Sequence, residues 1–382
     1  MIKHLKKYSL LSILIFPCLA FAGDNNKINS LANQFMQENN VEGLSIAVIN
    51  NNQITTYNYG YANELTHTKT SNKTIYRVAS FSKTYAATLE ALAQIEGKVK
   101  LDHSITDYLP GLTNDALKPI TVKMLVAHTG SLPFDFNPTP ENYTEAIADL
   151  NKLKPQATPG SEYSYSNVSI GLNGYILQNV YGQSYDNILQ NKIAKPLNLH
   201  STYLHLPPYL ESYAALGHDP DKIRPYDKNV DVWFAASSLK SNINDMAKFV
   251  RAQFNDNFDD KNLVKAFALV HQNYYCFANG ISCEQLGWQA HTMTELNNSV
   301  GDTYFKYFDA NGSSIFTPQK IVNDNTLKNK AIFIDKTCSG YGMSGYMLYD
   351  PAHKVGVVIL LNKSLGAERV RLGRDILRLQ SL

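Results

Sequence analysis

The stretch SFSKTYAATLEALAQIEG, residues 80–97, shapes the interpretation of the rest of the sequence. Apolar side chains point to nearly all sides of a helix built from this stretch. These residues are Tyr85, Ala86, Ala87, Leu89, Leu92, Ala93 and Ile95. A helix that is apolar on nearly all sides is buried in a large domain. Gly97 supplies the left-handed residue that often follows a helix. The sequence therefore predicts a buried central helix from Ser80 to about Glu96.

This helix begins with a serine and a lysine one turn apart. Ser80 and Lys83 are three residues apart, so their side chains share a helix face. The start of a helix favours negative charge on the serine oxygen, and a lysine with a depressed pKa can accept its proton. The alternative is a helix cap and a surface lysine. A second match, from Ser237 to Lys240, lacks the apolar helix that follows Ser80.

A Tyr-Ser-Asn triplet provides the second candidate element. Tyr165-Ser166-Asn167 follows Pro159-Gly160 and lies at a helix predicted to run from just after that turn to about Tyr181. A tyrosine kept partly ionised by lysines can act as general acid or base. An asparagine amide can bind both a lysine and a substrate amide. The alternative is a turn with a packed tyrosine.

The third candidate element is Lys336-Thr337, on the first strand of a C-terminal meander. An exposed strand edge can pair with an extended substrate backbone. Lys336 would add positive charge beside Tyr165 and hold a substrate carboxylate, and the alternative is an ordinary strand lysine. Cys338 alternates onto the same face as Lys336. We expect its thiol to border the site with a pKa lowered by nearby cations; the alternative is a buried, inert cysteine.

β-rich runs lie near both ends of the sequence and helical patterns lie between them. The predicted strands are residues 44–49, 53–59, 330–337, 345–349 and 355–361, with helices at 244–254 and 367–379. This order predicts an α+β fold, in which both chain ends form one antiparallel sheet flanked by helices and an all-helical lobe is inserted. We expect one domain over 23–382, with an α/β lobe at about 23–79 and 240–382 and a helical lobe at about 80–239.

The first 22 residues predict a secretory signal peptide. Lys3, Lys6 and Lys7 precede an apolar run, and Ala20-Phe21-Ala22 has the small-x-small pattern of a cleavage site. The alternative, a transmembrane helix, is disfavoured because the run is short. We therefore expect a periplasmic protein without a membrane anchor.

Composition and cysteines narrow the classes of function. The 382 residues are 44% hydrophobic and 18% charged with a net charge of +2, which indicates a globular protein without the basic excess of nucleic-acid binding. In an oxidising compartment Cys276 and Cys283 are expected to pair, the alternative being two free thiols. The sequence contains no CxxC and no HExxH pattern, so it gives no indication of a zinc site.

Taken together, the three elements resemble class C β-lactamases, within the wider serine β-lactamase and penicillin-recognising family. The resemblance runs from about Leu31 to the C-terminus. The motifs that carry it are Tyr76-Arg-Val-Ala-Ser80-Phe-Ser-Lys83-Thr, Pro159-Gly160, Tyr165-Ser-Asn167-Val-Ser-Ile-Gly171, the stretch 239–248, Gly287-Trp288, Lys336-Thr337 and Asn362-Lys363-Ser364.

The resemblance implies a β-lactamase/transpeptidase-like fold and a site between two lobes. It implies that Ser80 is acylated and that Lys83 and Tyr165 move its proton, with no metal or cofactor. The substrate-binding residues that it implies are Asn167, Lys336, Thr337 and Ser339, the last sharing the oxyanion hole with the backbone N–H of Ser80. The substrate would be a small β-lactam or a D-Ala-D-Ala peptide, and the protein is expected to be a monomer.

Departures from the family pattern concern substrate contacts. Cys338 replaces the family's glycine, Ser237 stands where a tyrosine lines the substrate platform, and Phe134-Asp135 follows Leu132-Pro133 in place of a glutamine. Three functions remain open: a β-lactamase, a D-alanyl-D-alanine carboxypeptidase or esterase, and a non-hydrolysing penicillin-binding sensor. The first two differ in how fast water reaches the acyl-enzyme. An α/β-hydrolase is disfavoured because no GxSxG pattern occurs.

Overall fold

The computed structural model describes residues 19–254, 258–278, 280–297, 318–322 and 324–380. Its centre is an eleven-stranded sheet in which all neighbouring strands run antiparallel. In spatial order the strands are β3 (Thr68–Lys69), β2 (Gln53–Asn63), β1 (Gly43–Asn50), β15 (Val355–Leu361), β14 (Met343–Asp350), β13 (Ile332–Gly340), β11 (Gln289–Thr292), β10 (Ser282–Glu284), β9 (Tyr275–Phe277), β12 (Gln319–Val322) and β5 (Glu162–Tyr163).

The two ends of the chain pair with each other within this sheet, as the sequence predicts. β1 pairs with β15 in the register Leu44↔Leu361 to Asn50↔Val355. Two smaller pairs lie beside the main sheet: β4 (Tyr76–Arg77) with β8 (Lys240–Ser241), and β6 (Gly217–Asp219) with β7 (Lys222–Arg224). The predicted α+β class, with an antiparallel sheet from both chain ends, is confirmed.

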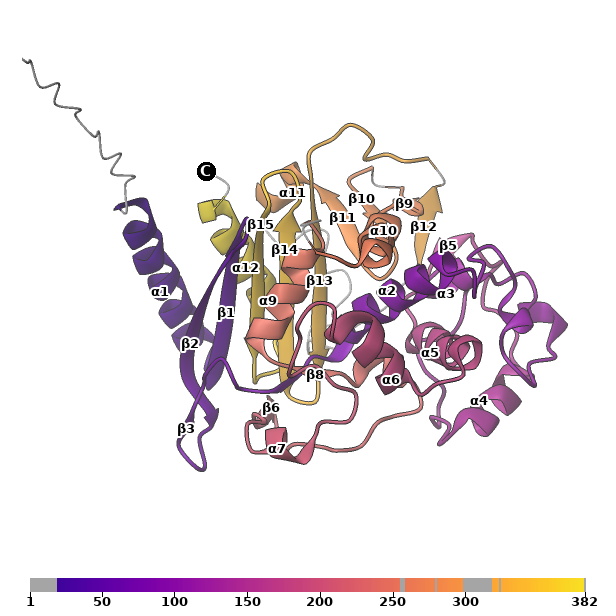
Figure 1. Ribbon diagram of the computed structural model, residues 1–382, viewed down its shortest axis with the longest axis horizontal. Helices are drawn as coiled ribbons and strands as arrows, with labels where there is room; N and C mark the ends of the chain where they lie inside the picture. Colours follow the sequence, from indigo (N-terminus) through magenta and orange to yellow (C-terminus); the bar gives the residue numbers. More distant parts are fainter. Residues whose placement is uncertain (1–18, 255–257, 279, 298–317, 323, 381–382) are drawn as a thin grey trace, which may run out of the picture.

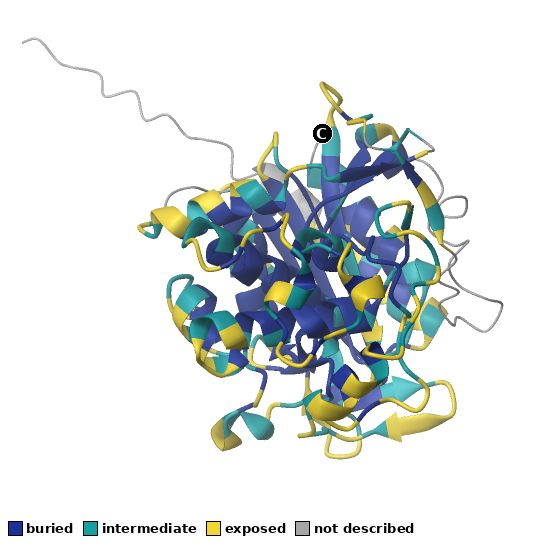
Figure 2. Cartoon of the chain, turned by 90° about the vertical axis from the view of Figure 1, so that its right-hand side faces the viewer, coloured by how far each residue is buried: buried dark blue, intermediate teal, exposed yellow. Residues whose placement is uncertain are grey.

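Both faces of the sheet are covered, which explains why β15, with the sequence VGVVILL, is apolar and buried along its whole length. Along β1, Leu44, Ile46 and Val48 join one core and Ala47 and Ile49 join the other. Helices α1 (Leu19–Asn39) and α12 (Ala367–Gln380) cover the first face, and α9 (Ile243–Ala252) packs on β1 and β15 from the second. Buried residues fill the space between these layers (Figure 2).

Helix α2 (Ser82–Ile95) runs through the centre of the second core (Figure 1). Residues 82–93 are all buried, as the apolar pattern predicts, and Gly97 follows the helix with φ +70°. Gly287 also has φ +70°, and a Cβ there would lie 2.9 Å from the main-chain oxygen of Lys83. A glycine is therefore required where this loop meets α2.

Most of the remaining helices lie around α2 (Figure 1), whereas the short helix Met293–Asn297 contacts β11 and β13 instead. The remaining helices are α3 (Val122–Val126), α4 (Tyr143–Leu150), α5 (Asn167–Tyr181), α6 (Tyr185–Leu189), α7 (Pro208–Glu211), α8 (Phe234–Ser237), α10 (Lys261–Val270) and α11 (Met293–Asn297), with short helical turns η1 (Ala79–Phe81), η2 (Ile105–Asp107), η3 (Asp115–Leu117) and η4 (Gln190–Ala194). Helix α5 begins later than predicted, because Ser166 caps it by accepting a hydrogen bond from Ser169 N at 3.0 Å.

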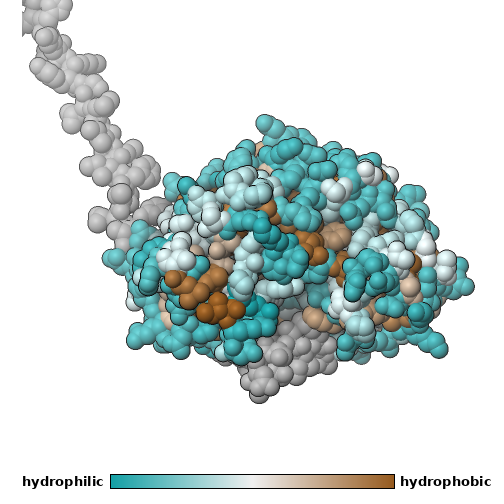
Figure 3. Space-filling view, turned by 90° about the horizontal axis from the view of Figure 1, so that it is seen from below, coloured by the Kyte–Doolittle hydropathy of each residue, from teal (hydrophilic) through white to brown (hydrophobic). Residues whose placement is uncertain are grey.

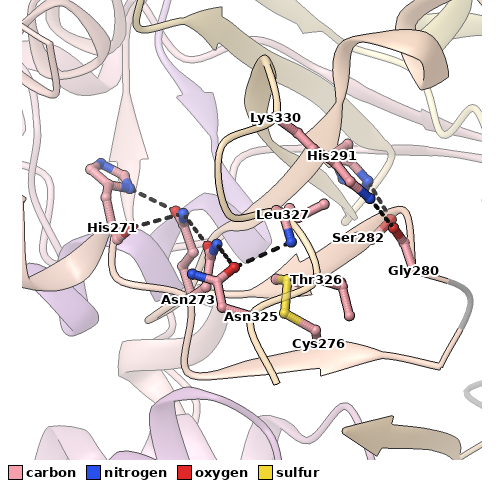
Figure 4. The surroundings of a disulfide bond; sticks show 12 residues. His271, Asn273, Cys276, Gly280, Ser282, His291, Asn325, Thr326, Leu327 and Lys330 are labelled. Carbon is pink, nitrogen blue, oxygen red and sulfur yellow. Dashed lines mark hydrogen bonds between the residues drawn. A yellow bond between two sulfur atoms is a disulfide. The ribbon is translucent and has the colours of Figure 1, made fainter. Parts of the chain in front are cut away.

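Cys276 and Cys283 form the predicted disulfide. They face each other in the β9–β10 pair (Figure 4). Of the predicted signal peptide, residues 1–18 lie outside the described part and residues 19–22 belong to α1. No described helix is long and apolar enough to cross a membrane.

Candidate active site

Ser80 lies in η1, immediately before α2. The predicted start of the helix therefore falls within a tighter turn, and the α-helix itself begins at Ser82. Its neighbour Ala79 has φ +40°, a backbone conformation that costs energy for any residue with a Cβ. The turn runs directly into α2, because Phe81 N donates to the main-chain oxygen of Val78 at 3.0 Å and Ser82 N donates to that of Ala79. Ser80 therefore lies at the N-terminal end of α2, where the helix dipole favours developing negative charge on its hydroxyl.

Lys83 reaches back along α2 to Ser80. Its Nζ donates to Ser80 Oγ at 3.1 Å, to Asn167 Oδ1 at 2.8 Å and to the main-chain oxygen of Ala236 at 2.9 Å. The residue is fully buried. Burial lowers the pKa of Lys83, and the charge of Lys336 lowers it further, although Tyr165 opposes both. A lysine in this setting can release and accept a proton closer to neutral pH than an ordinary lysine.

Tyr165 is the second group that contacts Ser80. Its hydroxyl donates to Ser80 Oγ at 2.9 Å, and the Nζ atoms of Lys83 and Lys336 lie 4.8 and 5.2 Å from its ring centroid. Burial raises the pKa of Tyr165, but the charges of Lys336 and Lys83 and the hydrogen bonds with Lys83 and Ser80 outweigh burial and hold the pKa below its ordinary value. The serine oxygen thus contacts two groups that can exchange protons with it.

Strand β13 forms one wall of a cavity of about 380 Å³ in front of Ser80. The lining includes the site residues predicted from sequence, which are Ser80, Tyr165, Asn167, Lys336, Thr337 and Ser339. Lys83 is enclosed behind them and touches Ser80. The structure therefore brings all seven together, although three separate segments of the sequence carry them.

His128 is a part of this site that the sequence analysis missed. Its main-chain oxygen accepts from Ser164 N at 2.7 Å, and its Nδ1 accepts from Ser166 N at 3.2 Å. Its ring lies 4.4 Å from that of Tyr165. His128 therefore holds both backbone neighbours of Tyr165. Burial, then the charges of Lys83 and Lys336, lower the pKa of His128 well below its ordinary value, so the ring is neutral.

Aromatic side chains on the cavity wall were also not predicted. Phe134 is 43% exposed and stacks 6.3 Å from Tyr165, measured between ring centroids. Trp233 donates through Nε1 to Asp135 Oδ1 at 2.7 Å. Tyr341, in the turn after β13, is 37% exposed. These rings provide apolar surface in the cavity that Ser237 also lines, and the family has a tyrosine at the position of Ser237. A single aromatic residue in a loop gives no sequence signal that it lines a binding cavity.

Cys338 corrects one of our expectations. The residue lines the cavity but only 2% of it is exposed, and burial raises the pKa of its thiol to about 12, outweighing Arg369, Lys336 and Lys83. The expected low pKa is therefore wrong. Cys338 pairs with Gly345 across β13 and β14, and a Cβ on Gly345 would come within 3.0 Å of the sulfur. The missing side chain at Gly345 provides room for this cysteine.

Among the described residues, no group of three or more His, Cys, Asp and Glu side chains is placed to hold a metal ion. What the cavity offers is a serine oxygen contacted by a buried lysine and by a tyrosine of lowered pKa. This arrangement suits transfer of an acyl group to the serine. The fold and the site thus define a serine acyl-transfer enzyme.

Comparison with known proteins gives the family. A family model described as β-lactamase matches residues 28–381. The β-lactamase of Pseudomonas fluorescens is 30% identical over 358 residues, which cover 92% of this chain and 97% of that protein. The chain belongs to the β-lactamase family.

Solved structures agree on the fold and the class. A class C β-lactamase in complex with cefoxitin is 26% identical with a TM-score of 0.83, covering 94% of this chain and 99% of that one. A β-lactamase/D-alanine carboxypeptidase from Pseudomonas syringae is 27% identical with a TM-score of 0.83, covering 93% and 99%. The chain is a class C serine β-lactamase-like protein with the β-lactamase/transpeptidase-like fold.

Proposed function

We propose that this protein hydrolyses the amide bond of β-lactams through an acyl-enzyme on Ser80. The observation that carries the proposal is the contact of Ser80 Oγ with both Lys83 Nζ, at 3.1 Å, and Tyr165 Oη, at 2.9 Å. A serine hydroxyl is a weak nucleophile unless a neighbouring base takes its proton. Here two candidate bases reach it inside one cavity.

The first half-reaction opens the ring. Ser80 Oγ bonds to the lactam carbonyl carbon while its proton passes to Lys83 or Tyr165. The backbone N–H groups of Ser80 and Ser339 would stabilise the negative oxygen. When the carbon–nitrogen bond breaks, Tyr165 returns a proton to the nitrogen. The amine stays attached to the acyl group, because the broken bond belonged to a ring.

The second half-reaction frees the serine. Tyr165, with Lys83 beside it, accepts a proton from a water that attacks the ester carbon, and Ser80 leaves with a proton. Asn167 would bind the substrate's side-chain amide while its Oδ1 holds Lys83 at 2.8 Å. Lys336 and Thr337 would bind the substrate carboxylate at the β13 wall of the cavity.

Carboxypeptidase activity on D-Ala-D-Ala peptides, or esterase activity, is the second candidate. It is favoured by the similarity to the Pseudomonas syringae protein, whose description combines β-lactamase and D-alanine carboxypeptidase. Both reactions use the same acyl-enzyme chemistry. A penicillin-binding sensor that does not release the acyl group is the third candidate. It is motivated by Cys338 and Ser237, which stand where the family has a glycine and a tyrosine.

For the cellular setting, we propose that residues 1–22 are removed as a signal peptide and that the mature protein acts as a monomer in the periplasm. The Cys276–Cys283 disulfide supports an oxidising compartment. There it would protect the cell from β-lactam antibiotics. We further propose one domain over 23–382, with an α/β lobe at about 23–79 and 240–382 and a helical lobe at about 80–239.

Steady-state hydrolysis of a chromogenic cephalosporin, run beside release of D-alanine from a D-Ala-D-Ala peptide, tests the main proposal. We expect catalytic turnover of the cephalosporin with a higher kcat/KM than for the peptide. Peptide turnover alone would favour the carboxypeptidase. An adduct on Ser80 that persists for hours, with neither product, would favour the sensor.

A further inference from the structure

A second cavity, of about 390 Å³, lies next to the active site. Tyr341 lines both cavities. The second cavity is formed by β4, β7, β8, β14 and the segments beside them, and its lining is Ile75, Arg77, Ala214, Ala215, Lys222, Ile223, Arg224, Pro225, Tyr226, Asp227, Lys240, Tyr341 and Met343. Ser80 does not line it, so the acyl-transfer chemistry leaves this cavity without a function.

Basic side chains dominate the charge of the second cavity. Four of its lining residues are basic and one is acidic; they are Arg77, Lys222, Arg224, Lys240 and Asp227. Two further acids lie close by without lining it. Asp219 pairs with Arg224, and Asp231 Oδ2 accepts from Arg77 Nη2 at 3.2 Å. The excess of bases thus holds for the lining residues, while Asp186 is a third nearby acid that acts on Lys240.

Two of the four bases are buried, and one of them has an unused donor. Arg77 is 7% exposed, and its Nη1 has no hydrogen-bond partner in the described part of the chain. The acid beside it, Asp227, is 4.0 Å away. A buried guanidinium N–H without an acceptor is costly. Arg77 therefore offers a charged donor that an anion in the cavity would satisfy.

Lys240, on β8, also lines the second cavity. It is 1% exposed, and its Nζ donates to the main-chain oxygen of Leu204 at 2.9 Å. Burial, followed by the charge of Arg77, lowers the pKa of Lys240 to about 8. Asp227, Asp186 and Asp231 oppose this lowering. Arg77 and Lys240 are paired across β4 and β8, and an anion beside these two buried cations would reduce their repulsion.

Apolar groups make up much of the remaining lining. Ile75, Ile223, Pro225 and Met343 contribute side chains, and the Tyr341 ring lies 3.3 Å from the Arg77 guanidinium carbon. This end of the molecule, with β6 and α7 in Figure 1, has a mainly hydrophilic surface with small apolar patches when seen from below (Figure 3). A free inorganic ion would leave the apolar wall unused, whereas an acid on a small hydrocarbon body fits both parts.

We propose that the second cavity binds a small organic anion, with its acid group at Arg77 and Lys240 and its apolar body against the neighbouring wall. This assigns a role to the lysine of the second Ser-x-x-Lys sequence, which lines this cavity and not the one with Ser80. Tyr341 lines both this site and the cavity that contains Lys336. The proposal does not depend on the hydrolytic activity.

Isothermal titration calorimetry with benzoate tests the proposal, using benzamide as the uncharged analogue at matched ionic strength. We expect saturable binding of benzoate and at least tenfold weaker binding of benzamide. Arg77→Gln should weaken benzoate binding at least tenfold. Because Arg77 also contacts Asp231, the Arg77→Gln protein could fail to fold. A second variant therefore changes Lys222, an exposed lysine that lines the cavity. Lys222→Glu should raise the Kd for benzoate at least threefold.

Two further variants locate the site. Lys195→Glu makes the same charge change at an exposed lysine that lines neither cavity, and it should leave Kd within 1.5-fold. Lys336→Ala removes the cation of the active-site cavity and should also leave Kd unchanged. Equal binding of benzoate and benzamide, equal effects of Lys222→Glu and Lys195→Glu, or loss of binding in Lys336→Ala would overturn the proposal.

Discussion

Two Ser-x-x-Lys sequences lie close together in this protein, and only one forms a nucleophile with its base. Ser80 lies in η1 and Lys83 in the first turn of α2 that follows it, and Lys83 Nζ is 3.1 Å from Ser80 Oγ. Ser237 ends α8, whereas Lys240 belongs to β8. Ser237 Oγ donates to Asp231 Oδ2 at 2.9 Å, and Lys240 Nζ donates to Leu204.

The difference shows that the backbone, and not the residue spacing, makes the pair. Both lysines are buried and both have lowered pKa values. A continuous helical turn places residues i and i+3 on one face, but a change from helix to strand between Ser237 and Lys240 separates them. Ser237 lines the active-site cavity and Lys240 lines the neighbouring one.

The largest expected effect comes from exchanging the two serines for alanine. Ser80→Ala removes the nucleophile, so kcat/KM for a chromogenic cephalosporin should fall by about 10⁴-fold or more. Ser237→Ala should change it by no more than about tenfold, because that serine contacts Asp231 and no base. Labelling by fluorescent penicillin provides the second readout. Undiminished labelling of Ser80→Ala would refute the assignment of Ser80.

The same substitution at both lysines sharpens the comparison. Lys83→Met should slow acylation by about 10²–10⁴-fold, the usual contribution of a general base. Lys240→Met should slow it by less than about tenfold, since Lys240 has no contact with Ser80. Stopped-flow acylation measures both, and circular dichroism confirms that both variants fold. Equal rate losses would contradict the separation of the two sites.

His128 provides a smaller effect, on stability. Its pKa is lowered in the folded state, so the unfolded state binds more protons once the pH falls below about 6.5. Stability is then lost as the pH falls. Asn at position 128 keeps an acceptor for Ser166 N but does not titrate. Between pH 6.5 and 5.5, the parent protein should lose about 1 kcal/mol more than His128→Asn.

Urea unfolding at the two pH values measures this difference. Other histidines, such as His271 with its pKa lowered by burial to about 4, contribute to both proteins and cancel in the comparison. A parallel pH dependence in the two proteins would show that His128 is protonated as easily when folded as when unfolded.

The smallest effect is expected at Cys338. Because burial raises the pKa of its thiol, iodoacetamide should leave it unmodified in the folded protein, with or without a bound β-lactam. Cys338→Gly should retain kcat/KM within about threefold, since Gly345 already provides space for the sulfur. Peptide mapping after alkylation tests the first expectation, and modification that a β-lactam prevents would restore our original interpretation of a reactive thiol.

Sequence predicted well what depends on periodicity and on chain order. The apolar pattern of residues 82–93 indicated a buried helix, and the strand runs at the two ends indicated the sheet, because each pattern reflects burial along one local element. The contact of Ser80 with Lys83 followed from helical spacing in the same way.

What sequence could not predict depends on contacts between distant segments. His128 gives no pattern of its own, and its role appears only when the 127–133 loop packs against Tyr165. The environment of Cys338 depends on Gly345 across the β13–β14 pair, which strand alternation alone does not reveal. Alternation placed the thiol at the cavity wall but could not show how completely its neighbours cover it.

Rapid acid quench during turnover of a cephalosporin, followed by intact-mass analysis and peptide mapping, tests the central claim most directly. We predict a transient adduct retaining the opened lactam, located on Ser80, which disappears when the substrate is consumed. The adduct should be absent from Ser80→Ala and present in Ser237→Ala. An adduct on Ser237, or turnover by Ser80→Ala at the parent rate, would contradict the account.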